Sequence, residues 1–105
     1  MTEPKILPLP GPALTLSETD VVRSRILSEF SSGNYRVVLD MGAVKMVDSS
    51  WLALIVGLLK KASQQQGDIK LANVQPMVRK VIELMRLHKV FDIHDSTDAA
   101  VAAFH

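Results

Sequence analysis

The spacing of apolar residues changes several times along this 105-residue chain, and each change predicts a change of secondary structure. The run Val37–Leu39 is continuously apolar and rich in β-branched residues, which is typical of a strand buried on both faces. Further short strands are expected in segments 6–9, 68–73 and 90–93. Apolar residues three and four positions apart predict helices, which we place at residues 15–32, 49–66, 76–87 and 97–104.

Capping residues, glycine and proline near the expected ends of these elements support the boundaries. Thr15 and Glu18 fit a capping box at the start of the first helix, and Gly33-Asn34 is suited to end it. Pro8 lacks a backbone donor, so residues 6–9 should form either an edge strand or an extended arm. Pro76 favours the first turn of the third helix. The third helix should turn an apolar stripe toward the core, formed by Val78, Val81, Ile82 and Met85.

The alternation of strands and helices predicts a single α/β domain over residues 1–105. We expect a mostly parallel sheet of four to five strands with about four helices, joined by right-handed crossovers. Residues 1–15 offer one candidate strand and form a short N-terminal arm.

Composition narrows the classes of partner. Twelve basic residues against eleven acidic ones give no electrostatic reason to expect nucleic acid or an anionic membrane. The absence of cysteine excludes thiolate metal sites and fits a reducing compartment. The N-terminus lacks the pattern of a secretory signal. The longest apolar run, 51–59, is too short to span a bilayer. We expect a cytoplasmic protein without membrane insertion.

The candidate chemistry lies at the entry to the second helix, where Asp48, Ser49 and Ser50 precede an apolar run. These side chains are typical of a helix N-cap. They also place two hydroxyl groups at the junction between a strand and a helix. Trp51, Leu54 and Leu58 form a second apolar stripe on this helix. The stripe is either covered by the third helix or exposed as a partner-binding surface.

Other chemistry finds little support. The three histidines share no ligand spacing, so we expect no metal and no cofactor, and the methionines are interpreted as core filling. A nucleophilic serine needs a base and an oxyanion hole, and the sequence contains no G-x-S-x-G elbow. We therefore do not expect an enzyme.

The stretch VVLDMGAVKMVDSSWLALIVGLLKKA, residues 37–62, resembles the core signature of STAS domains of the anti-sigma-factor antagonist type. In that signature a buried strand ends in Asp or Asn, and Asp-Ser-Ser/Thr-Gly-Leu opens an apolar helix after a short loop. The segments GDIKLANV at 67–74, 76–87 and VFDI at 90–93 resemble the elements that follow. The resemblance covers roughly residues 34–104.

The resemblance implies a regulatory binding module in which the first serine after the aspartate is phosphorylated. Carried over by residue, the phosphoacceptor is Ser49, and Asp48 and Ser50 are its surroundings. The implied partners are an anti-sigma factor that is also a serine kinase, and a PP2C-like phosphatase. The unphosphorylated form binds the kinase and so frees a sigma factor for transcription, and phosphorylation ends that complex.

The chain departs from the pattern at two places. Trp51 stands where the family has glycine, and the N-terminal arm lacks the family's second strand and its acidic loop residue. An alternative role in the same family is a non-phosphorylated subunit that supports the ATPase of a lipid transporter. Absence of phosphate and co-purification with an ATPase subunit would favour that alternative.

Overall fold

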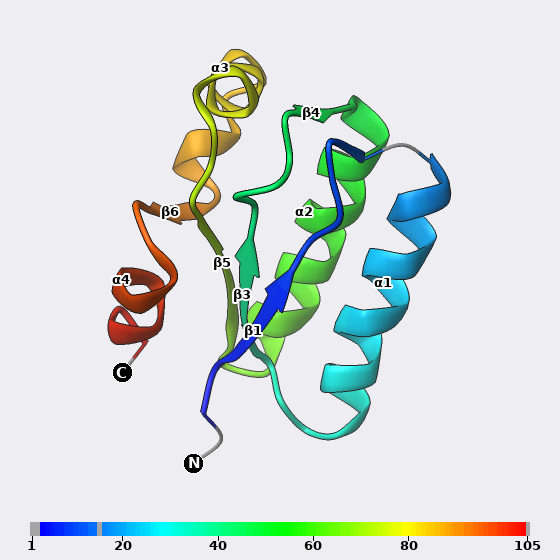
Figure 1. The fold of residues 1–105 in the computed structure, drawn as a ribbon. Helices are drawn as coiled ribbons and strands as arrows, with labels where there is room; N and C mark the ends of the chain where they lie inside the picture. The colour runs from blue at the N-terminus through cyan, green and yellow to red at the C-terminus, as the bar shows by residue number, and fades with distance from the viewer. Residues whose placement is uncertain (1–2, 15, 105) are drawn as a thin grey trace.

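A computed structural model describes residues 3–14 and 16–104, so the predicted cap at Thr15 lies outside the described residues. Four helices and two small sheets make up this part of the chain (Figure 1). In chain order the elements are β1 (Lys5–Pro8), β2 (Ala13–Leu14), α1 (Leu16–Ser31), β3 (Arg36–Asp40), β4 (Met46–Val47), α2 (Ser49–Gln64), β5 (Asp68–Ala72), α3 (Pro76–Leu84), the short 3-10 helix η1 (Leu87–Lys89), β6 (Asp92–His94) and α4 (Thr97–Ala102).

The main sheet has the strand order β1-β3-β5-β6, and all of its pairs are parallel. This confirms the predicted α/β class with a parallel sheet and four helices. β1 lies at the sheet edge, where Pro8 costs no ladder hydrogen bond. β3 lies in the centre, as its continuous apolar run requires.

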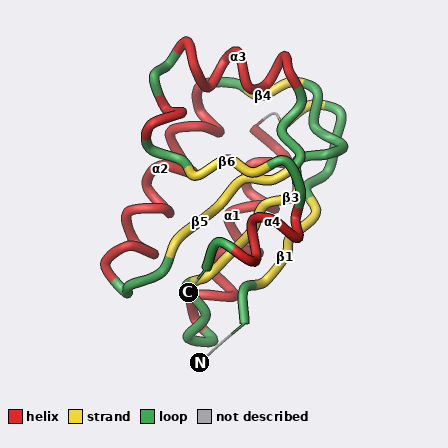
Figure 2. The backbone as a smooth tube through the Cα atoms, turned by 90° about the vertical axis from the view of Figure 1, so that its left-hand side faces the viewer, coloured by secondary structure: helices red, strands yellow, loops and turns green. Residues whose placement is uncertain are grey.

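The two faces of the sheet are covered unequally. Side chains alternate along each strand, so Val37 and Leu39 lie beside Ile69 and Leu71 on one face, which α1 and α2 cover. On the other face Val38 and Ala72 pack against Ala100 of α4. Figure 2 shows α4 crossing in front of β1 and β3. The larger core therefore lies on the side of α2, the helix that begins with Ser49.

Several local predictions are corrected. The N-terminal arm contains a second strand, β2, which pairs with β4 in a separate two-stranded sheet. A strand of two residues has no periodicity that a sequence pattern can reveal. The last strand begins at Asp92 rather than Val90, because η1 occupies residues 87–89.

The methionines of the third helix are not core residues. Met77 is 69% exposed and Met85 is 42% exposed, whereas Val78 and Ile82 are buried. The helix ends at Leu84, so Met85 no longer follows the core-facing stripe. Among the described residues, no helix is both long enough and apolar enough to cross a bilayer.

An ion pair between a buried lysine and a partly exposed aspartate links β6 to the sheet. The Lys70 side chain is 8% exposed, and its Nζ donates to Asp92 Oδ2 at 2.6 Å and to Asp68 Oδ2 at 3.0 Å. It also lies 4.7 Å from the centre of the Phe104 ring. Burial lowers the pKa of Lys70, but its hydrogen bonds to the two carboxylates outweigh burial and raise the pKa above its ordinary value. The hydrogen bond from Lys70 lowers the pKa of Asp92.

The Asp92 contact should make stability depend on pH. We expect Asp92→Asn to lower the free energy of unfolding by about 1 kcal/mol at pH 7. Because the pKa of the Asp92 carboxyl is lower in the folded state, this stabilisation is complete above the unfolded pKa and is lost as pH falls through the folded pKa. The free energies of unfolding of wild type and Asp92→Asn, measured with urea, should therefore become equal in acid. Asp95→Asn, at an exposed position, serves as the control. If the difference in free energy of unfolding between wild type and Asp92→Asn did not change with pH, the stabilising role of the Asp92 contact would be contradicted.

Candidate functional site

The segment that leads to Ser49 begins at Asp40, the last residue of β3. Asp40 Oδ1 accepts hydrogen bonds from Gly42 N at 3.0 Å and from Asn73 Nδ2 at 3.1 Å. Gln75 Nε2 donates to Gly42 O at 2.6 Å. The loop after β5 thus ties down the loop after β3. This explains why a buried strand that ends in a carboxylate precedes the Ser49 helix.

The N-terminal arm holds the same loop from the other side. Pro12 O accepts from Lys45 N at 2.7 Å and from Met46 N at 3.1 Å, and β2 then pairs with β4. A Cβ atom at Gly11 would lie 1.8 Å from Ala43 O, so only glycine permits this close approach. The strand immediately before Ser49 is therefore fixed by backbone contacts.

Asp48 is the N-cap of α2. Its backbone is extended, and its Oδ1 accepts from Trp51 N at 2.9 Å. Such a cap contributes about 1 kcal/mol to helix stability. Asp48 therefore fulfils the structural role that its sequence position predicts, and Ser49 and Ser50 become the first two residues of the helix.

The three polar residues of the site, Asp48, Ser49 and Ser50, are all exposed. Ser49 lies in the first helical turn, where the backbone N–H groups have no partner within the helix and the helix dipole is positive. This end of α2 favours an anion, and the Asp48 carboxylate already uses one of the donors. The arrangement presents a hydroxyl to solvent at a position that tolerates added negative charge.

Trp51 and Leu58 do not form the exposed stripe that the sequence left open. Trp51 is 0% exposed, Leu58 is 5% exposed, and Leu54 is partly buried against the same core. The assignment of Trp51 and Leu58 as partner-binding residues is wrong, because their side chains fill the core beneath the sheet. Trp51 does not cover Ser49, since its side chain is buried whereas Ser49 and Ser50 are exposed.

Sequence reasoning missed the residues that support the site from a distance, Asn73 and Gln75. The register of β3 and β5 could have revealed Asn73. Asp40 and Ala72 are paired, so Asn73 follows beside Asp40 at the carboxyl ends of these parallel strands. Within the described ranges, no group of three or more His, Asp or Glu residues is placed to hold a metal ion.

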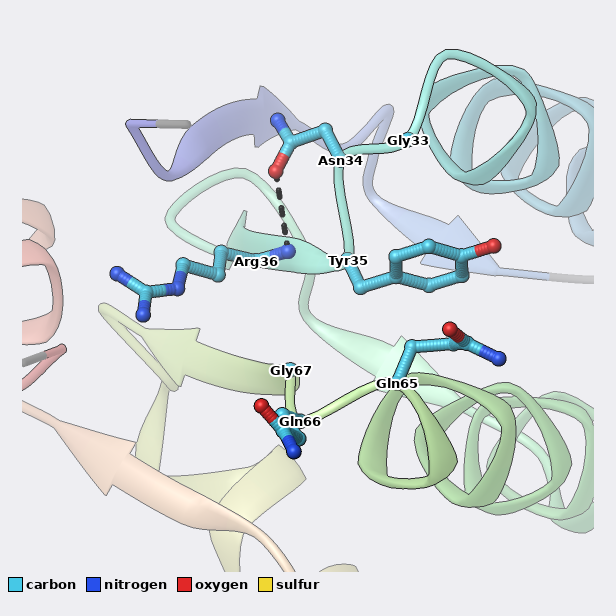
Figure 3. A pocket seen from close by; sticks show the side chains of 7 residues that line it. All are labelled: Gly33, Asn34, Tyr35, Arg36, Gln65, Gln66 and Gly67. Carbon is cyan, nitrogen blue, oxygen red and sulfur yellow. Dashed lines mark hydrogen bonds between the residues drawn. The ribbon is translucent and has the colours of Figure 1, made fainter. Parts of the chain in front are cut away.

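A separate pocket lies at the opposite end of α2 (Figure 3). It has a volume of about 160 Å³, and Tyr35, Gln65 and Gly67 are among its lining residues. In it Asn34 Oδ1 accepts from Arg36 N at 3.1 Å. The 16 residues of α2 separate this pocket from Ser49 by about 24 Å at 1.5 Å per residue. The pocket is therefore not part of the Ser49 site.

Comparison with known proteins agrees with this geometry. The STAS domain family profile matches residues 2–100, and the chain belongs to this family. BtrV of Bordetella bronchiseptica, described as a candidate anti-sigma factor antagonist, is 30% identical over 88 residues, which cover 84% of this chain and 76% of BtrV.

Solved structures show the same fold. The crystal structure of a candidate anti-sigma factor antagonist from Thermotoga maritima has a TM-score of 0.81 at 23% identity, covering 92% of this chain and 85% of that one. The Bacillus cell fate determinant SpoIIAA in its phosphorylated form has a TM-score of 0.69 at 21% identity, covering 92% of this chain and 87% of that one.

Proposed function

We propose that this protein is an anti-sigma-factor-antagonist-like binding module that is switched by reversible phosphorylation of Ser49. The observation that carries the proposal is the exposed hydroxyl of Ser49 in the first turn of α2, directly after the Asp48 cap. The family membership and the description of BtrV support the class of function. The Bacillus SpoIIAA structure supports the view that this fold accommodates a phosphate.

The proposed partners are a serine kinase that is also an anti-sigma factor, and a PP2C-like phosphatase. Phosphate adds about −1.5 to −2 charges at neutral pH. At the α2 N-terminus the domain itself tolerates this charge, but a partner packed over Ser49 would have to desolvate it beside the Asp48 carboxylate. The phosphate thus prevents one complex without requiring the domain to change its conformation.

The proposal is tested by the intact mass of the protein isolated from its own cells under several growth conditions. We expect a condition-dependent mass increase of one phosphate that is absent in Ser49→Ala and retained in Ser50→Ala. Ser50 is the matched control because it is the next exposed hydroxyl of the same helical turn.

A single unmodified mass in every condition would overturn the switch. Co-purification of that unmodified protein with an ATPase subunit would then favour the transporter-supporting role. A phosphate that persists in Ser49→Ala and disappears in Ser50→Ala would move the switch to the neighbouring residue.

A further inference from the structure

The outer side of α3 exposes apolar side chains that the fold does not use. Met77 is 69% exposed and Leu84 is 75% exposed, while Val78 and Ile82 attach the helix to the core. Positions 77 and 84 are seven residues apart and therefore lie on one side of the helix, with the partly buried Val81 between them. Met77 and Leu84 thus form an outward stripe, and Val81 beside it packs partly against the core.

The segment that carries this stripe is positively charged. The segment 76–90 carries four basic side chains and one acidic side chain, although the whole chain has a net charge of only +1. All five of these charged side chains are exposed: Arg79, Lys80, Glu83, Arg86 and Lys89. Glu83 is engaged by Arg79 at 3.4 Å, and Lys80 is the basic residue that lies beside Leu84 on the helix. We call the stripe with these basic residues the α3 surface.

The α3 surface lies at the same end of the molecule as Ser49. α3 packs beside β4, and β4 leads directly into the start of α2 (Figures 1 and 2). Gln75, which precedes α3, is hydrogen-bonded to the loop between β3 and β4. Met46 of β4, three residues before Ser49, is also apolar and is 67% exposed. One partner can therefore contact α3 and the Ser49 site together.

We propose that the α3 surface docks into an apolar groove, rimmed by carboxylates, on the protein that recognises the Ser49 site. This inference rests on the proposed function and assigns the chemistry of its partner. Apolar anchors in a groove supply most of the affinity of an interface, and complementary charge supplies orientation and association rate. Ser49 then decides whether the complex persists, while the α3 surface decides which protein is bound.

The charge and shape of the surface favour this occupant over two others. A second copy of the chain docked face to face would bring the same basic residues against one another. Membrane-surface helices bury a broad apolar face that commonly includes aromatic residues, whereas α3 has no aromatic residue and turns Val78 and Ile82 into the core.

The test begins with a photo-crosslinking amino acid placed at Leu84 in the protein's own cells, with Val21 as matched position. Val21 is 54% exposed on α1, and α2 lies between α1 and α3 (Figure 1). The protein captured at Leu84 is then purified. Its affinity is measured for wild type, Leu84→Ser, Lys80→Glu and Ser49→Asp, with Val21→Ser and Lys60→Glu as controls.

We expect an adduct at Leu84 and none at Val21. Affinity should fall about tenfold or more in Leu84→Ser and in Lys80→Glu, and the controls should match wild type. The affinity of wild type should also fall as salt is raised, because exposed charges are screened. Absence of an adduct, or unchanged affinity in both α3 variants, would overturn the inference.

Two other occupants would also overturn it. The first is a cross-linked dimer of the chain itself. The second is a membrane surface, which would be indicated if the protein binds vesicles of equal phosphatidylglycerol and phosphatidylethanolamine and Leu84→Ser abolishes that binding. If Ser49→Asp weakens binding and the α3 variants do not, the inference fails and the proposed switch stands. If only the α3 variants weaken binding, the docking surface stands and the switch fails.

Discussion

Trp51→Ala is expected to lower the free energy of unfolding by about 3–5 kcal/mol, the range for removing a large aromatic side chain from a core. Trp51 is fully buried among core residues of α2 and the sheet, so its loss leaves a cavity that neighbouring side chains fill only in part. Urea unfolding followed by circular dichroism measures the change. Trp51→Gly should cost somewhat more than Trp51→Ala, because glycine loses more backbone freedom than alanine on folding.

Trp51→Phe is the matched control. It keeps most of the ring volume and removes the indole Nε1, which is buried without a hydrogen-bond partner among the described residues. An unpaired buried donor costs about 1–3 kcal/mol, so Trp51→Phe should lose much less stability than Trp51→Ala. Trp51 is the only tryptophan, and its fluorescence should move to longer wavelength on unfolding. A loss below about 1 kcal/mol in Trp51→Ala would contradict its place in the core.

The parts of the fold that sequence reasoning predicted are those with strong periodicity. The buried strand at Val37–Leu39 and the helix that begins at Ser49 were placed almost to the residue, because a continuous β-branched run and a cap followed by apolar spacing have few other solutions. β2 and η1 were missed. Each has only two or three residues, and backbone contacts such as those at Pro12 O hold β2 and β4 in place.

The local structure at Asp48 and Ser49 was predicted from the sequence, but its surroundings were not. The Asp48 cap and the exposure of Ser49 follow from local sequence, because a cap accepts from the backbone three residues later. Whether the Trp51 side chain is buried could not be predicted from local sequence. A helix that is apolar over a wide arc does not show which of its sides packs against another layer. Met77 was misassigned because its residue type favours the core. Its exposure depends on how α3 sits against β4, which is a tertiary property.

Phosphoserine at position 49 is expected to weaken partner binding about a hundredfold while leaving the fold intact. Desolvating a dianion beside the Asp48 carboxylate costs several kcal/mol in a complex, and each tenfold loss of affinity corresponds to about 1.4 kcal/mol. In the free domain the same phosphate remains in solvent at the α2 N-terminus, where the helix dipole contributes about 0.3–1 kcal/mol in its favour. Calorimetric titration of the partner and thermal unfolding of the phosphorylated protein measure the two effects.

The matched control is phosphoserine at position 24, an exposed serine of α1 that adds the same charge away from the α2 N-terminus. It should leave partner affinity near that of the unmodified protein, which separates a local effect at Ser49 from a change in net charge. A fall in thermal stability on phosphorylation at Ser49 would mean that the phosphate acts by loosening α2. Unchanged stability with lost binding would place its effect at the interface, because only there does the phosphate leave water.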